Sequence, residues 1–211
     1  MKEYRIPTAF GEIELIEKRS RFIGRVWPVT TEEEALERLK SIRDQHADAN
    51  HNVYAYIIRD GNLMRYSDAG EPQGTAGQPV LNVFVKEEIE NVLCVVTRYF
   101  GGTLLGSGGL VRAYAEAAKS ALDAAGISAV RRWQRLRLTC TYPQYERLQK
   151  TAADQGAVTE STDFGADITL TLLIPEAETA TLCTALRDTS AGTAVLELLD
   201  IQEIPVPISF P

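Results

Sequence analysis

The sequence predicts an α+β protein with two domains, residues 1–127 and 128–211. Its 211 residues are enough for two modest domains that each bury a core. In the first part, strand-like and helix-like segments are mixed, and adjoining strands can pair as antiparallel hairpins. In the second part the predicted order is strand, helix, strand, strand, helix, strand. That order indicates a ferredoxin-like (βαββαβ) split sandwich.

Alternation of apolar and polar side chains predicts the strands of the first domain. These strands are expected in segments 11–29, 51–61, 63–68 and 91–100. The last segment, NVLCVVTRYF, is β-branched and nearly all apolar, as in a strand buried on both faces. The sequence Asp60–Gly61–Asn62, between the second and third segments, is a hairpin signal.

Three helices are expected in the first domain, in segments 31–46, 80–89 and 110–126. Thr30 or Thr31 is placed to cap the first helix, which has acidic residues in its first turn. Thr75 is placed to cap the second helix, and Pro79 suits its first turn. The third helix is rich in Ala and ends at Gly126, where a C-terminal glycine belongs.

The second domain is predicted to contain four strands and two helices. The strands are expected in segments 130–142, 157–164, 166–175 and 194–206, and the helices in 143–156 and 176–190. Charge is uneven here, because residues 151–211 contain ten acidic residues and one basic residue. Basic residues gather just before them, at Arg131, Arg132, Arg135, Arg137, Arg147 and Lys150. This stripe is either a contact for RNA or an acidic partner, or, as we favour, a solvated sheet face.

Composition and charge exclude several classes of protein. A formal net charge of −7 argues against a general nucleic-acid binder, so any polyanion contact must come from a local patch. No apolar run approaches the roughly 18 residues of a membrane span, and the N-terminus lacks a signal-peptide core. We therefore expect a cytoplasmic protein with no membrane contact.

The cysteine and histidine content points away from metal and redox chemistry. Cys94, Cys140 and Cys183 lie far apart without a CxxC spacing, so reduced structural cysteines are expected. His46 and His51 cannot by themselves build a three-histidine metal site. We expect no metal ion and no cofactor.

A glycine-rich loop joins the predicted strand 91–100 to the helix 110–126. It contains Gly101, Gly102, Gly106, Ser107, Gly108 and Gly109, between Arg98 and Arg112. Such a loop leading into a helix presents free backbone N–H groups and favours an anion. The spacing matches neither a P-loop nor a GxGxxG dinucleotide motif. The glycines therefore either bind an anion such as a phosphate backbone, or allow close packing of helix and strand.

A second loop, SDAGEPQGTAG, contains Asp68 and Glu71, and His51 lies one hairpin earlier. These three side chains could converge in a cleft for acid–base chemistry or divalent metal binding. Turn chemistry alone also favours such a sequence, with Asp for an Asx-turn, Gly for a positive φ and Pro for rigidity. A pair between Glu71 and Arg98 or Arg112 is the structural explanation of these charges.

Four blocks of the sequence resemble the hallmark blocks of the IMPACT/YigZ family. They are EKRSRFIG, HNVYAYIIR, SDAGEPQGTAGQPVLNV and VVTRYFGGTLLGSGGLVRAY, in the family's order across roughly residues 15–115. The positions that match the family blocks are Ser20, Arg21, Phe22, His51, Asn52, Asp68, Gly70, Glu71, Pro72, Gly74, Thr75, Ala76, Gly77, 97–102, Gly106, Gly108, Gly109 and Arg112. The chain departs from the family at Ala69, where a second acidic residue is common, which weakens a metal-site interpretation.

The resemblance implies a bacterial two-domain member without the RWD domain of eukaryotic relatives. Its first domain would be similar to ribosomal protein S5 domain 2. Its second domain would be similar to the ferredoxin-like domains of elongation factor G. Eukaryotic members regulate translation, so the resemblance implies RNA, the ribosome or a translation-related protein as the partner.

Three functional hypotheses follow. The leading one is a non-enzymatic protein that binds RNA or a ribosomal surface, with Arg21, Arg98 and Arg112 beside the glycine loop meeting phosphates. The alternative is a small metal- or nucleotide-dependent hydrolase or phosphotransferase that uses His51, Asp68 and Glu71 together with the glycine loop. A third possibility is a protein–protein adaptor that docks through its second domain.

Overall fold

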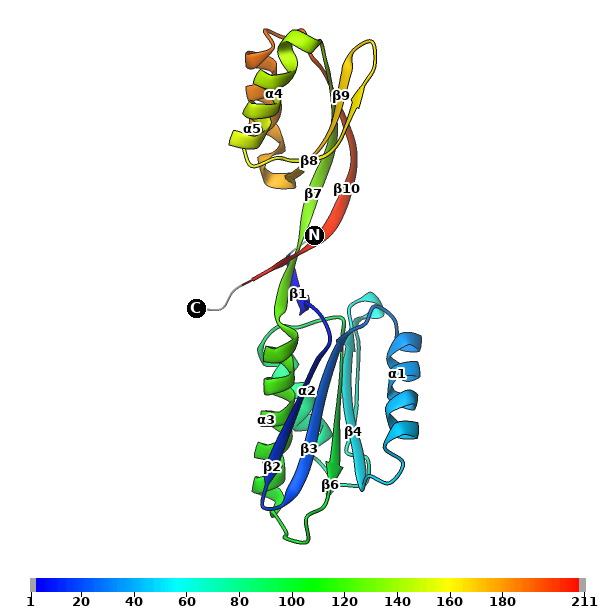
Figure 1. Ribbon diagram of the computed structural model, residues 1–211. Coiled ribbons are helices and arrows are strands. Elements are labelled where there is room, and N and C mark those ends of the chain that lie inside the picture. Colours follow the sequence, from blue (N-terminus) through cyan, green and yellow to red (C-terminus); the bar gives the residue numbers. More distant parts are fainter. Residues whose placement is uncertain (1–2, 209–211) are drawn as a thin grey trace. The chain divides into compact units, whose positions relative to one another are not determined.

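The computed structural model describes residues 3–208 (Figure 1). The chain is an α+β protein with two compact units, and each unit is built on its own antiparallel sheet, as predicted. Of the described residues, one unit contains 4–129 and 205–208, and the other contains 3 and 130–204. The chain passes from the first unit to the second within strand β7 (Ile127–Cys140).

The first unit contains a five-stranded sheet in the order β2-β3-β6-β4-β5. Its strands are β2 (Gly11–Glu17), β3 (Ser20–Pro28), β4 (His51–Ile58), β5 (Leu63–Ser67) and β6 (Val92–Tyr99). A short strand β1 (Tyr4–Pro7), which the sequence did not predict, precedes them. The predicted turn between β4 and β5 is a 3-10 turn at Asp60–Asn62.

Helices cover both faces of this sheet (Figure 1). They are α1 (Glu32–Gln45), α2 (Gly77–Lys86) and α3 (Ser107–Ala125). On β6, Val92, Cys94 and Val96 belong to the core under α2 and α3, and Leu93 and Val95 belong to the core under α1. This alternation confirms that β6 is buried on both faces.

Two helix starts differ from the sequence prediction. Helix α2 begins at Gly77, and Thr75 does not cap it, because the Thr75 hydroxyl donates to the Pro72 carbonyl at 2.6 Å. Asp68 takes this part instead, and its Oδ1 accepts from the backbone N–H groups of Ala76 and Gly77 at 3.1 and 2.8 Å. Helix α3 begins at Ser107, so two glycines that were assigned to the loop form its first turn.

The Ala-rich helix α3 packs directly on the backbone of β2 and β3. A Cβ atom at Gly24 would lie 2.5 Å from the Ala117 carbonyl oxygen, so only glycine permits this approach. Gly11 on β2 makes the same kind of approach to Ala121 and Ala125. Small side chains on the helix and glycines on the strands together allow the close layer spacing.

The second unit contains the predicted order of elements. Its sheet has the order β1-β7-β9-β8, and β10 also pairs with β7, on a branch off this order. After β7 come α4 (Tyr142–Asp154), β8 (Val158–Phe164), β9 (Ile168–Pro175), α5 (Thr179–Thr189) and β10 (Val195–Pro207). Alternate residues of β9, from Ile168 to Ile174, are buried in one core with Leu148 of α4 and Leu182 of α5.

The basic stripe of β7 is neutralised by acidic residues of its own unit. Arg135 contacts Glu160 and Asp200 at 2.8 and 3.1 Å, and Arg137 contacts Glu197 at 2.8 Å. Arg131 and Arg132 also pair, with Glu3 and Glu176. This pairing favours the solvated sheet face over a contact for RNA.

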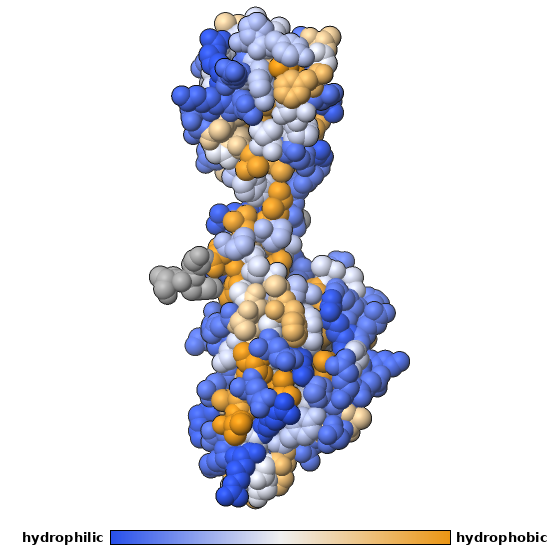
Figure 2. Space-filling view, in the orientation of Figure 1, coloured by the Kyte–Doolittle hydropathy of each residue, from blue (hydrophilic) through white to orange (hydrophobic). Residues whose placement is uncertain are grey.

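The three cysteines are unpaired, and Cys94 and Cys140 are buried. Burial raises the pKa of both of these thiols, as expected for structural cysteines. Within residues 3–208, no helix combines the length and the apolar character that crossing a membrane requires. Figure 2 shows hydrophilic residues over most of the visible face, with hydrophobic residues in small groups between them.

Candidate functional site

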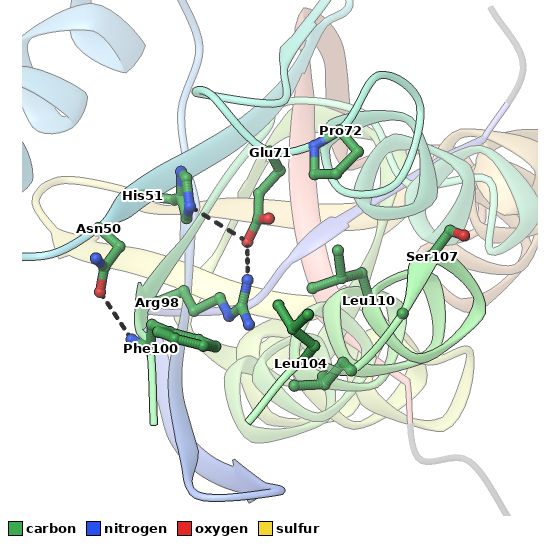
Figure 3. A pocket seen from close by; sticks show the side chains of 11 residues that line it. Asn50, His51, Glu71, Pro72, Arg98, Phe100, Leu104, Ser107 and Leu110 are labelled. Carbon is green, nitrogen blue, oxygen red and sulfur yellow. Dashed lines mark hydrogen bonds and ion pairs between the residues drawn. The ribbon is translucent and has the colours of Figure 1, made fainter. Parts of the chain in front are cut away.

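A pocket of about 470 Å³ lies in the first unit, beside the ends of β4 and β6 and the start of α3 (Figure 3). One part of its wall is polar and contains His51, Glu71 and Arg98. The apolar part contains Pro72, Phe100, Leu104, Leu105 and Leu110, and the remaining lining residues are Asn50, Gly106 and Ser107. The pocket therefore joins the two loops that the sequence singled out.

Strand register explains why three polar side chains meet here. His51 on β4 and Phe22 on β3 are both register partners of Arg98 on β6. Because strand side chains alternate between faces, Ser20 of β3 lies on the same face as Phe22. This face carries the α2–α3 core farther along each strand, so the three strands present Ser20, His51 and Arg98 where that core ends.

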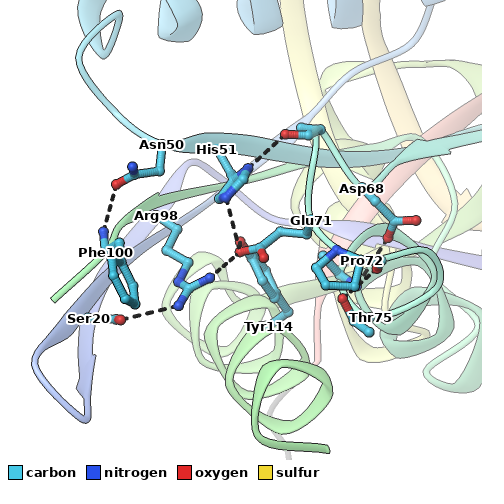
Figure 4. Close-up of polar contacts among 12 residues, drawn as sticks. Ser20, Asn50, His51, Asp68, Glu71, Pro72, Thr75, Arg98, Phe100 and Tyr114 are labelled. Carbon is cyan, nitrogen blue, oxygen red and sulfur yellow. Dashed lines mark hydrogen bonds and ion pairs between the residues drawn. The ribbon is translucent and has the colours of Figure 1, made fainter. Parts of the chain in front are cut away.

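Glu71 and Arg98 form a buried ion pair at the centre of the polar wall (Figure 4). Arg98 Nη1 donates to Glu71 Oε1 at 2.5 Å, and the two side chains are only 6% and 4% exposed. Arg98 Nη2 also donates to the Ser20 hydroxyl at 3.3 Å. Of the pairs expected from the sequence, Glu71–Arg98 is therefore present.

Arg98 is further enclosed by two aromatic rings. Its guanidinium carbon lies 5.4 Å from the ring centre of Phe22 and 5.6 Å from that of Phe100. Both distances are in the range of a cation–π contact. Arg98 Nε is buried and has no hydrogen-bond partner among the described residues.

Tyr114 of α3 completes the environment of Glu71. Its hydroxyl donates to Glu71 Oε1 at 2.7 Å, and the residue has no exposed surface. Burial, together with the negative charge of Glu71, raises the pKa of Tyr114 well above its usual range. The phenol therefore stays neutral and acts as a hydrogen-bond donor.

His51 is oriented by the backbone of the second loop. Its Nδ1–H donates to the Ala69 carbonyl at 2.9 Å, and its Nε2 lies 3.7 Å from Glu71 Oε1. Gly70, with a φ of +90°, stands against the imidazole ring, where an added Cβ would lie 3.4 Å from Nδ1. The loop thus presents Nε2 of His51 to the Glu71 carboxylate.

Asp68 does not join this group. One of its carboxylate oxygens accepts the two N–H groups at the start of α2, and the other accepts from Gly74 N at 2.8 Å. Its part is to hold the 68–77 loop, and the Glu71 N–H donates to the Asp68 carbonyl at 3.0 Å. Residues 3–208 contain no group of three or more His, Cys, Asp or Glu side chains arranged to hold a metal ion.

The glycines of the first loop have different structural roles. Gly101 approaches the backbone of Arg19 and Ser20 so closely that a Cβ would collide with it. Gly102 and Gly106 have φ values of +80° and +75°, which favour glycine. Gly101 therefore does allow close packing, but against the β2–β3 turn, and not between helix and strand as the sequence predicted.

The start of α3 presents unpaired backbone groups. Gly106 is its N-cap without a side-chain hydrogen bond, and the N–H groups of Ser107, Gly108 and Gly109 have no backbone acceptor among the described residues. The Arg112 side chain folds toward this end, with Nη1 3.6 Å from the position of a Cβ at Gly108. Such a helix start attracts anions.

The arginines expected to contact phosphates lie in three different environments. Arg98 is buried and paired, and Arg21 is half-exposed and pairs with Glu14 at 2.8 Å. Arg112 is exposed and has no ion-pair partner among the described residues. Two further exposed cations at the β2–β3 turn, Lys18 and Arg19, likewise have none within residues 3–208.

Sequence reasoning missed Tyr114, the apolar pocket wall and the cations of the β2–β3 turn. Tyr114 occupies a core position of an amphipathic helix, so its spacing gave no sign of a polar contact. Lys18 and Arg19 stand in the block EKRSRFIG, but only the structure places their turn against Gly101.

Comparison with known proteins identifies relatives along the whole chain. The Impact N-terminal domain family matches residues 18–122, and a domain of unknown function (DUF1949) matches residues 138–193. An IMPACT family member of Haemophilus influenzae is 33% identical over 206 residues, covering 96% of this chain and 100% of its own. The IMPACT family member YigZ of Escherichia coli is 32% identical with the same coverage.

A relative matched over part of its length and a solved structure point to the same family. The IMPACT family member YvyE of Bacillus subtilis is 44% identical over 118 residues, which cover 56% of this chain and 54% of that protein. A crystal structure described as a hypothetical protein is 30% identical, covers 95% of this chain and 98% of its own, and has a TM-score of 0.59. The family expected from the sequence blocks is confirmed: the chain belongs to the IMPACT family, in the bacterial YigZ-like two-domain form.

Proposed function

We propose that this protein is a non-catalytic, translation-related factor that binds RNA, free or on a ribosomal surface. The contact is made by the loop end of the first domain, which we define as Lys18, Arg19, residues 100–106 and Arg112. The observation that carries the proposal is the set of three exposed cations without ion-pair partners in the described chain, beside the unpaired N–H groups of α3.

This arrangement suits phosphates because backbone recognition needs only cations and N–H donors in the right places. Elsewhere in the chain, arginines such as Arg25, Arg59 and Arg135 are held by carboxylates. The net charge of −7 limits contacts away from the loop end. RNA binding is therefore expected to be confined to one small area and to be sensitive to salt.

Arg98 has a different part in this proposal from the one expected from the sequence. Its ion pair with Glu71 and its burial make it a support of the pocket wall, and Arg112 becomes the principal phosphate contact near α3. The hydrolase or phosphotransferase alternative loses support, because the Asp68 carboxylate is occupied by three backbone N–H groups.

Family membership supports the link to translation. The mouse protein named IMPACT is 34% identical to this chain over 106 residues. The pairing of β7 with β10 and β9, and of β9 with β8, supports assigning the second domain to the ferredoxin-like sandwiches. We also propose that the first domain is similar to ribosomal protein S5 domain 2, so that both domains have folds found in the translation machinery.

The proposal is tested by fluorescence anisotropy with a labelled single-stranded RNA, and by co-sedimentation with ribosomes, at about 50 and 200 mM salt. Three phosphate contacts predict a loss of affinity of about 20-fold across this range. The double variant Arg19→Gln/Arg112→Gln is expected to lower the slope of log affinity against log salt by about 1.4.

The matched control is Lys40→Gln/Lys86→Gln, which removes two exposed cations from α1 and α2. It should bind RNA as the wild type does. Wild-type binding that ignores salt, or a control that loses as much affinity as the loop-end variant, would contradict the proposal.

A further inference from the structure

We propose that the pocket beside the loop end takes one unstacked base of the bound RNA, while the phosphate of that nucleotide lies at the start of α3. This inference rests on the proposed function and names the part of the RNA that the pocket recognises. The evidence comes from the apolar wall, an unpaired carboxylate oxygen in the polar wall, and the position of Arg112.

The pocket has the size and the wall of a base site. Its volume of about 470 Å³ lies within the range of small-molecule pockets, roughly 300–1,000 Å³. Leu104, Leu105, Leu110 and Pro72 offer flat apolar contacts, and Phe100 adds an aromatic ring (Figure 3). Flipped bases are held between apolar and aromatic side chains of this kind.

The polar wall is held in place by Arg98. This residue is 5% exposed and lines the pocket. Its Nε–H has no partner among the described residues and is also fully enclosed, so it offers no contact to a ligand. Cation–π contacts and the bonds to Glu71 and Ser20 fix the guanidinium, and the guanidinium in turn fixes the Glu71 carboxylate.

The polar wall offers an unpaired acceptor. The contacts of the Glu71 carboxylate with His51, Arg98 and Tyr114 all go to Oε1, and Oε2 has no partner among the described residues. Every nucleobase presents an N–H donor on its Watson–Crick edge. Guanine presents two adjacent N–H donors there, so guanine is expected to bind most tightly.

The phosphate site adjoins the base site. Gly106 and Ser107 line the pocket and also begin α3, where three N–H groups are unpaired. The Arg112 guanidinium reaches the same helix start beside Gly108. One nucleotide therefore finds cationic and N–H contacts for its phosphate next to a cavity for its base.

The first experiment compares wild-type binding of a guanosine-containing single-stranded RNA with binding of the same strand carrying abasic sites. The expected affinity for the intact strand is about tenfold higher, from the stacking and hydrogen bonds of one base. Calorimetry is expected to rank GMP above AMP, CMP and UMP, and all four above inorganic phosphate.

The variant Ser107→Trp places a large ring at the pocket mouth, at an exposed position. It is expected to bind intact and abasic strands equally. The control Ser41→Trp adds the same ring at an exposed position on α1 and should keep the tenfold preference.

The outcomes separate the two proposals. Salt-dependent binding of intact and abasic strands with equal affinity by the wild type would overturn the base pocket and leave RNA binding intact. A Ser107→Trp variant that keeps the tenfold preference would overturn it as well. No binding of either strand at 50 mM salt would overturn the proposed function, and the base pocket with it.

Discussion

The buried pair between Glu71 and Arg98 makes a quantitative prediction about the stability of the first domain. In Glu71→Ala the Arg98 guanidinium stays in a site that is 6% exposed and loses its carboxylate at 2.5 Å. Removing one partner of a buried pair leaves an uncompensated charge and costs about 3–5 kcal/mol. With a urea dependence of about 2 kcal/mol per molar, the unfolding midpoint should fall by about 2 M.

The double variant Glu71→Leu/Arg98→Met separates burial from pairing. Replacing both charges by apolar groups of similar volume is often nearly neutral, so a loss below about 2 kcal/mol is expected. The double variant should then be far more stable than the summed losses of the single variants Glu71→Leu and Arg98→Met predict. This non-additivity is the signature of a direct interaction.

The assay follows urea unfolding by fluorescence. The chain has two tryptophans, Trp27 in the first unit and Trp133 in the second. A Trp133→Phe background leaves Trp27 as the reporter of the first domain. A loss below 1 kcal/mol in Glu71→Ala, or additive losses in the double variant, would refute the reasoning that this pair is desolvated and coupled.

The remaining predictions concern packing, a hydrogen bond and pH. Gly24→Ala should lower the free energy of unfolding by about 1–3 kcal/mol, because its Cβ would meet the Ala117 carbonyl; urea unfolding measures this, and an unchanged midpoint would contradict it. Tyr114→Phe removes one hydrogen bond to the Glu71 carboxylate, and the same assay should show a loss of about 1.5–3 kcal/mol; a loss near zero would refute its role. Burial, and then the charge of Arg25, lower the pKa of His46 below 6.5. The neutral imidazole accepts a hydrogen bond from Arg25 at Nε2 and donates one from Nδ1–H to the Tyr99 hydroxyl. Since the unfolded chain therefore takes up the proton first, this contribution to stability is complete above about pH 6.5 and is lost as the pH falls through the folded-state pKa. Unfolding at pH 7.5 and 5.5 should show a smaller loss in His46→Gln than in the wild type, and an equal loss would refute the assignment.

Periodic patterns in the sequence predicted most of the helices and strands, and also the site residues that lie on strands. The period of two on β6 places Arg98 on the same face as Val92, Cys94 and Val96, and the same rule applies to His51 on β4. What the pattern could not supply was the pairing of β4 with β6 in register. That pairing joins residues 47 positions apart in the chain.

Contacts of loop residues were harder to predict, because more than one side chain in a loop can make the same capping hydrogen bond. Thr75 and Asp68 can both cap a helix, and local spacing favoured Thr75. Asp68 takes this position because the loop folds back and brings its carboxylate to Ala76 and Gly77. Glycines were ambiguous for the same reason, since close approach at Gly101 depends on a turn about 80 residues earlier.

The structure also explains how an acidic protein can keep a cationic contact area. Nine of the sixteen arginines pair with a carboxylate among the described residues, and one of these is Arg98, which is buried against Glu71. The β2–β3 turn and the start of α3 are different, because Lys18, Arg19 and Arg112 are exposed there and have no ion-pair partner within residues 3–208. Position in the fold, more than the number of basic residues, therefore decides which cations remain available to a phosphate. Introducing an acidic residue beside these cations, as in Thr103→Glu in the exposed loop, should weaken RNA binding more than removing any single paired arginine.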